Sequence, residues 1–105
     1  MASQGVPLDR AQLAAASEAY IRDTLQRRLP AQTRVYLYGS RARRDARWNS
    51  DYDLWIDSDI PDALIGRIQD DLEDSFVPYK VDIVTTPRLH GPFGEQVKKE
   101  AVRWI

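Results

Sequence analysis

The sequence contains no cysteine and only one histidine. The lack of cysteine excludes disulfide bonds and thiolate metal sites, and it agrees with a protein of the reducing cytoplasm. No stretch approaches the roughly 18 apolar residues that a membrane span needs, and the start of the chain does not resemble a signal peptide. A net charge of −1 gives no broad basic surface for DNA or RNA. We therefore expect a cytoplasmic protein that binds neither membranes nor nucleic acid directly.

The 105 residues are enough for one compact domain, with residues 1–7 as a loose tail. Apolar spacing and Gly/Pro punctuation predict alternating helices and strands. The predicted elements are a helix over 9–29, a strand over 33–38, a short helix over 41–47 capped by Ser40, a strand over 51–56, a helix from 59–61 to 76, a strand over 79–85 and a helix from near 92 to the end. This order predicts an α/β fold in which helices pack on a small mixed sheet.

Asp51 and Asp53 begin the second predicted strand, and side chains two residues apart in a strand point the same way. Aspartate is unfavourable in strands, so the pair needs a reason, although a solvated sheet face or a charged edge would also supply one. Asp82 lies between Val81 and Ile83 in the most apolar predicted strand. A buried carboxylate there requires a partner, either a metal ion or a hydrogen-bonding group of the protein.

If these strands pair, three carboxylates converge, and their repulsion favours a bound cation. Hard oxygen ligands suit Mg²⁺, which commonly also takes substrate phosphates. Two such ions can hold a triphosphate and an attacking oxygen in line. Asp51, Asp53 and Asp82 are therefore the predicted metal ligands and catalytic residues of a nucleotidyl transfer site, with Asp82 also able to accept a hydroxyl proton.

Gly39 and Ser40 stand where the first strand turns into a helix. Unpaired N–H groups at such a turn bind phosphate, and glycine lets the ligand approach the backbone closely. A plain turn with a helix cap explains the same pair. Several arginines follow this turn. A guanidinium group binds phosphate through two parallel hydrogen bonds, although a solvated charged face would explain the same arginines. The further predicted nucleotide-binding residues are Arg41, Arg43, Arg44 and Ser50.

With these residues in place, the chain resembles the nucleotidyltransferase superfamily that includes DNA polymerase beta and kanamycin nucleotidyltransferase. The superfamily motif is Gly-Ser, a spacer, Asp-x-Asp and a later acidic residue, here Gly39, Ser40, Asp51, Asp53 and Asp82. Residues 39–43 and 50–54 resemble the branch of minimal nucleotidyltransferase (MNT-type) antitoxins, and residues 100–104 resemble its closing helix. The family usually has glycine where this chain has Arg44, whose side chain would either crowd a triphosphate or add a cation to it.

The resemblance implies a polymerase beta-like fold over residues 9–105, with ATP as substrate and Mg²⁺, as two ions, as cofactor. It also implies a HEPN-type toxin as partner in a hetero-oligomer, silenced by transfer of AMP to one of its tyrosines. A domain of this size has little room to hold an acceptor, so we expect the acceptor to come from that partner. Two alternatives stay open: a toxin-binding module with weak or no chemistry, and a transferase for a small molecule such as an aminoglycoside.

Overall fold

The computed structural model describes residues 9–105, so the predicted tail over residues 1–7 lies outside the described residues. The elements are α1 (Arg10–Arg28), β1 (Val35–Tyr38), α2 (Gly39–Arg43), β2 (Tyr52–Ile56), α3 (Asp62–Glu73), β3 (Val81–Thr85), the short 3-10 helix η1 (Thr86–Arg88), α4 (Gly91–Glu100) and β4 (Val102–Arg103). The strands form one sheet in the order β3-β2-β1-β4. Strand β1 is antiparallel to β2 and β4, whereas β2 and β3 are parallel. This mixed sheet with helices packed on it confirms the predicted fold class.

Helix α1 begins as the sequence predicts. The Asp9 side chain accepts from the Gln12 backbone, and the Gln12 side chain accepts from the Asp9 backbone, which together form a capping box. The helix ends at Arg28, two residues before Pro30, and Leu29 is its C-cap. Proline disfavours helical geometry in the residue before it, so the chain turns here toward β1.

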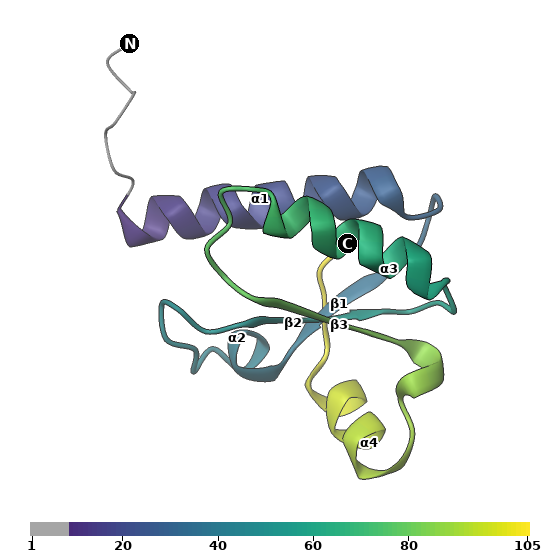
Figure 1. The fold of residues 1–105 in the computed structure, drawn as a ribbon. Helices are drawn as coiled ribbons and strands as arrows, with labels where there is room; N and C mark the ends of the chain where they lie inside the picture. The colour runs from purple at the N-terminus through teal and green to yellow at the C-terminus, as the bar shows by residue number, and fades with distance from the viewer. Residues whose placement is uncertain (1–8) are drawn as a thin grey trace.

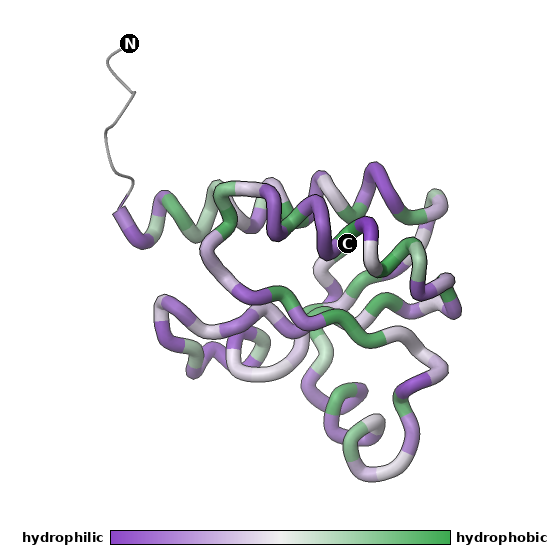
Figure 2. The backbone as a smooth tube through the Cα atoms, viewed as in Figure 1, coloured by the Kyte–Doolittle hydropathy of each residue, from purple (hydrophilic) through white to green (hydrophobic). Residues whose placement is uncertain are grey.

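The main hydrophobic core lies between the sheet and the pair of helices α1 and α3, which pack together on one face (Figure 1). Alternate residues of β2 face this core: Tyr52, Leu54 and Ile56 are fully buried, while Asp53 and Trp55 are half-buried on the other face. This alternation confirms the predicted division of the strand into two faces. Hydrophobic residues alternate with paler or hydrophilic residues along the strands, whereas the loop between α2 and β2 is mostly hydrophilic (Figure 2).

A smaller cluster lies on the opposite face of the sheet, where α4 packs (Figure 1). It consists of Tyr38, Leu89 and Val97, with Trp55 and Val84 against it. This second layer covers only part of the face and leaves the neighbouring carboxylates partly accessible. Within residues 9–105, no helix has the length and hydrophobicity that crossing a membrane requires.

The predicted final helix is wrong in its last residues. Helix α4 ends at Glu100, Ala101 takes an extended conformation, and Val102–Arg103 form the edge strand β4. In this strand Val102 pairs with Leu37 of β1. The apolar spacing of the last residues fits a helix, but the free edge of β1 offers backbone hydrogen bonds that a continued helix would leave unmade. The first and third strands also begin two residues later than predicted.

The short helix over 41–47 is also misplaced. Helix α2 begins at Gly39 with Tyr38 as its N-cap, and no side chain caps it, so Ser40 is inside the helix and not its cap. The helix ends at Arg43, and its C-cap residue Arg44 has a φ of 65° and a ψ of 29°, which place it in the left-handed region. Glycine is the usual residue at such a C-terminal position, because a Cβ atom is strained there. This geometry explains why a glycine would suit the position of Arg44.

Replacing Arg44 with glycine should therefore stabilise the protein. The left-handed conformation costs a residue with a Cβ atom about 1–2 kcal/mol, and the greater unfolded-state freedom of glycine offsets part of the gain. We expect Arg44→Gly to raise the free energy of unfolding by about 0.5–1 kcal/mol, as measured by urea denaturation. Arg44→Ala is the matched control, because it removes the side chain and keeps the strain. Equal stability of the two variants would contradict the explanation.

Candidate nucleotidyl transfer site

Backbone pairing brings the predicted acidic residues together. Asp53 of β2 is directly opposite Asp82 in the parallel ladder with β3. Asp51 stands immediately before β2, two residues from Asp53, so it extends the same face of the strand. The three aspartates, from segments about 30 residues apart in sequence, thus lie near the start of the two adjacent strands β2 and β3.

The electrostatics of this region are those of crowded carboxylates. The pKa of Asp53 is raised, first by burial and then by the negative charges of Asp82, Asp51 and Glu100. The pKa of the Tyr38 hydroxyl is raised to about 12, again by burial first and then by Asp53, Asp82 and Glu100. A cation placed here would relieve the repulsion that both groups experience.

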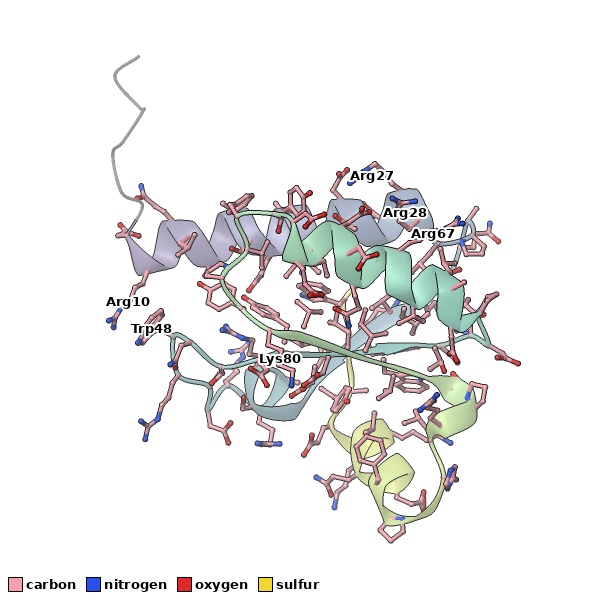
Figure 3. All side chains as sticks on the ribbon, in the orientation of Figure 1. Arg10, Arg27, Arg28, Trp48, Arg67 and Lys80 are labelled. Atoms are coloured by element: carbon pink, nitrogen blue, oxygen red, sulfur yellow. The ribbon has the colours of Figure 1, made fainter. Side chains whose placement is uncertain are left out.

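Asp82 is more accessible than its sequence neighbours predict. Its side chain is 44% exposed and its Oδ1 lies 3.6 Å from the Nζ of Lys80, at the start of β3 (Figure 3). The expectation of a buried carboxylate is therefore wrong. Strand β3 is at the edge of the sheet, so a side chain on its outer face is only partly covered even when its sequence neighbours are apolar.

The donor chemistry of the three aspartates fits Mg²⁺, which binds through carboxylate oxygens and retains water ligands. The side chains as they stand are not gathered around one point: within residues 9–105, no three acidic or histidine side chains are close enough together to hold a metal ion. Asp82 is paired instead with Lys80, and the negative charges of Asp82 and Asp51 raise the pKa of Asp53. Since the backbones are already adjacent, side-chain rotation is the change that metal binding would require.

Gly39 has a geometry that no other residue could adopt at low cost. Its φ is +75°, and a Cβ atom added to it would lie 2.3 Å from Oδ2 of Asp53. The backbone turn and the central carboxylate are therefore in direct contact. The Gly39 N–H donates to Oε1 of Glu100 at 3.0 Å, so this predicted phosphate donor already has a partner within the protein.

Arg41 holds the loop that leads to Asp51. Its Nε and Nη2 donate to the Ser50 carbonyl oxygen at 3.0 and 2.7 Å, and Nη2 also reaches the Trp48 carbonyl oxygen at 3.2 Å. The guanidinium carbon lies 3.9 Å from the centre of the Tyr52 ring. These contacts give Arg41 a structural role that the sequence did not predict.

Ser50 also has its polar groups engaged in the loop. Its hydroxyl accepts from the Arg47 N–H at 2.8 Å, and its own N–H donates to the Arg47 carbonyl at 3.1 Å. The loop is tied to α1 as well, because the Arg10 guanidinium lies 4.2 Å from the ring centre of Trp48 (Figure 3). Ser50 thus closes a turn beside Asp51.

The predicted arginine cluster divides into residues with different partners. Arg43 pairs with Asp45 at 3.2 Å and with Glu100 at 2.8 Å. Arg44 is exposed and strained, and Arg41 faces the loop. The structure therefore does not bring the three side chains to one point, although all of them flank the Gly39 turn.

Sequence reasoning assigned no site role to Glu100, which the structure places against Gly39 and Arg43. One signal was available. Glu100 follows Lys98 and Lys99 at the C-terminal end of a helix, where a negative charge opposes the helix dipole and basic residues are usual. An acidic residue in such a place indicates a specific partner elsewhere in the fold.

A cavity of about 460 Å³ borders Asp82. It runs between the end of α3 and the start of β3, and Gln69, Tyr79 and Lys80 are among its lining residues. A second cavity of about 520 Å³ is lined by the end of α1 and by Arg103 and Ile105. None of the predicted site residues lines this second cavity, so the first is the one that bears on the aspartates.

Comparison with known proteins shows the family of this chain. The family model of the polymerase beta nucleotidyltransferase domain matches residues 20–103, so the chain belongs to this family of nucleotidyltransferases. Within it, the chain belongs to the minimal nucleotidyltransferases: a solved structure of one is 31% identical, with a TM-score of 0.63, over 93% of this chain and 98% of that chain. A search of curated proteins finds no significant match.

Two solved toxin–antitoxin structures share the fold. One, a complex with AMP-PNP, is 22% identical with a TM-score of 0.67, over 83% of this chain and 72% of that chain. The other, a mutant of MntA–HpeT, is 20% identical with a TM-score of 0.64, over 83% of this chain and 71% of that chain. In this mutant two aspartates, two residues apart, are changed to glutamate. Asp51 and Asp53 have the same spacing here.

The contacts of Arg41 predict that lysine cannot replace it. Lysine keeps the charge but loses the forked donors and the flat surface over Tyr52. We expect Arg41→Lys to lower the free energy of unfolding by about 1–3 kcal/mol, measured by chemical denaturation. Arg47→Lys, at an exposed position of the same loop, is the control and should change stability little. Equal denaturation midpoints for Arg41→Lys and Arg47→Lys would show that Arg41 does not hold the loop.

The raised pKa of Asp53 predicts a gain in stability when its charge is removed. An acid whose pKa is raised by folding destabilises the protein once it ionises, so this cost is absent at low pH and grows as the pH rises through the folded pKa. Asp53→Asn should therefore melt at a higher temperature than wild type near pH 7, and the difference should shrink toward about pH 4. A lower melting temperature of Asp53→Asn near neutral pH would contradict the prediction.

Proposed function

We propose that this protein transfers AMP from ATP to a hydroxyl group, most suitably a tyrosine, of a HEPN-type toxin and thereby acts as its antitoxin. The single observation that carries the proposal is the register that sets Asp53 beside Asp82, with Asp51 two residues before, next to the left-handed turn at Gly39. Membership of the nucleotidyltransferase family supports the reaction type, and the toxin–antitoxin complexes that share the fold support the choice of partner.

In this proposal Asp51, Asp53 and Asp82 would hold Mg²⁺. When bound, the metal ion would supply positive charge to the triphosphate and to the attacking oxygen. Asp82, whose side chain is 44% exposed, has the position to receive the proton of the acceptor hydroxyl. Its pairing with Lys80 is weak enough at 3.6 Å and at these exposures to be exchanged for other partners.

The phosphate groups of ATP would be bound on the other side of the aspartates. Gly39 lets a ligand approach the backbone, and the Ser40 hydroxyl follows it directly in α2. Arg43 and Arg44 flank this turn and add positive charge. For Arg41 and Ser50 the proposed role is to hold the loop before Asp51. The Arg41 guanidinium and the Ser50 hydroxyl, which were predicted to bind the nucleotide, already have hydrogen-bond partners within this loop.

The acceptor would enter from the side of β3. The cavity of about 460 Å³ opens beside Asp82 and offers space for a side chain of a partner. Tyr79 and Lys80 line it, so its wall presents both an aromatic ring and a charge. A partner protein that inserts one side chain here would bring its hydroxyl group to Asp82.

A second candidate function is a toxin-binding module without chemistry. Exposed hydrophobic side chains are available for such binding: Trp48, Phe76 and Phe93, on three separate segments, are each at least 50% exposed and would be covered by a partner. The same surfaces would serve an enzyme that must dock its substrate protein. Only the effect of the aspartates on neutralisation separates the two candidates.

Incubation of the protein with labelled ATP, Mg²⁺ and a HEPN-type toxin tests the proposal. We expect label on the toxin, its loss with EDTA, and a loss of at least about 100-fold in rate in the Asp51→Ala, Asp53→Ala double variant, because these carboxylates would position the metal ions. The toxin's loss of activity should follow the label.

The matched control is the Asp70→Ala, Asp74→Ala double variant, which removes two exposed carboxylates from the end of α3. It should label the toxin at the wild-type rate. If the toxin is neutralised equally well by the Asp51→Ala, Asp53→Ala variant, without label, the binding module is the correct function. If label appears on a small-molecule acceptor and never on protein, the proposed acceptor is wrong.

A further inference from the structure

Glu100, the last residue of α4, contacts both ends of α2. Its Oε1 accepts from the Gly39 N–H at 3.0 Å, and its Oε2 accepts from Nη1 of Arg43 at 2.8 Å. Gln96, one turn earlier in α4, also donates to Oε2. Gly39 and Arg43 are the first and last residues of α2, so one carboxylate holds both ends of this helix.

This carboxylate is largely buried, since its side chain is only 10% exposed. Its pKa is lowered, first by the hydrogen bond from Gln96 and then by those from Gly39 and Arg43, so it is ionised at neutral pH. A negative charge at the C-terminal end of a helix is unfavourable by itself. The negative charge of Glu100 is therefore unfavourable for α4, and its hydrogen bonds to α2 compensate for this cost.

The contact between Glu100 and Gly39 bears directly on the aspartates. Gly39 is packed so closely against Asp53 that a Cβ atom could not fit between them. Any shift of the Gly39 turn would therefore change the space that the Asp53 carboxylate occupies. Glu100 restrains this turn through the N–H, and it also sets the direction of the Arg43 side chain.

We propose that Glu100 is a positioning residue of the nucleotidyl transfer site, whose carboxylate holds the Gly39 turn against Asp53 and aims Arg43 along the same side. The inference rests on the proposed function for its effect on rate. The alternative is that Glu100 occupies the place of a phosphate group, and that ATP must displace it from Gly39 and Arg43. The two roles predict different nucleotide affinities when the Glu100 carboxylate is removed. The affinity stays nearly the same if Glu100 only positions the turn, and it rises if ATP must displace Glu100.

Three variants separate these roles: Glu100→Ala, which removes every contact, Glu100→Gln, which keeps an acceptor for Gly39, and Glu95→Ala, a control at an exposed position of α4. We expect the kcat of toxin labelling to fall about 10- to 100-fold in Glu100→Ala and less in Glu100→Gln, because a small misplacement of reacting groups costs about this much. The KM for ATP should change by less than about threefold, since the loss falls on positioning. Glu95→Ala should match wild type.

A second measurement does not require activity. Amide hydrogen exchange of Gly39, followed by NMR, should be slow in wild type and Glu100→Gln and faster in Glu100→Ala, at a temperature where circular dichroism shows all variants folded. If wild type has no transferase activity while Gly39 remains protected, the proposed function fails and the structural link stands. Unchanged kcat in folded Glu100→Ala, or tighter binding of AMP-PNP to it, would overturn the positioning role.

Discussion

The parallel pairing of β2 with β3 is the constraint on which the rest of the site depends. It sets Asp53 opposite Asp82 on one face and keeps Leu54 opposite Ile83, toward the core, on the other. A slip of β3 by one residue would turn Asp82 toward the core and Val81 and Ile83 away from it, so burial of the apolar face enforces the register. The hydrophobic effect thus supplies the free energy that holds like charges side by side.

The charges around this pairing are balanced by neighbours of opposite sign. Lys80 lies near Asp82, and Arg43 is paired with Asp45 and Glu100. The Lys80–Asp82 and Arg43–Asp45 pairs are exposed, so they contribute little stability and can be exchanged, whereas the Glu100 partner of Arg43 is largely buried. In the proposed function, divalent cations and a triphosphate would replace exposed contacts of this kind, since partners that are bound too well would oppose the ligands.

Helix α2 is short because both of its ends are left-handed turns. Gly39 has a φ of +75° and Arg44 a φ of 65°, only five residues apart in sequence. A five-residue helix has little stability alone, so its position is set by Glu100 from α4 and by the loop that Arg41 holds. The turn next to the aspartates is therefore an element whose geometry comes from distant parts of the chain.

Local patterns in the sequence predicted the fold class, the start of the first helix at Asp9 and the alignment of Asp51 with Asp53, because hydrophobic periodicity and strand alternation act over a few residues. Local patterns could not determine the strand β4, the accessibility of Asp82 or the loop-holding role of Arg41. Each of these depends on which segment lies next to which: a free edge on β1, the edge position of β3 and the Tyr52 ring beneath the guanidinium. Only the tertiary structure brings Glu100 to Gly39, since that hydrogen bond joins residues 61 positions apart and no pattern within a single element encodes it.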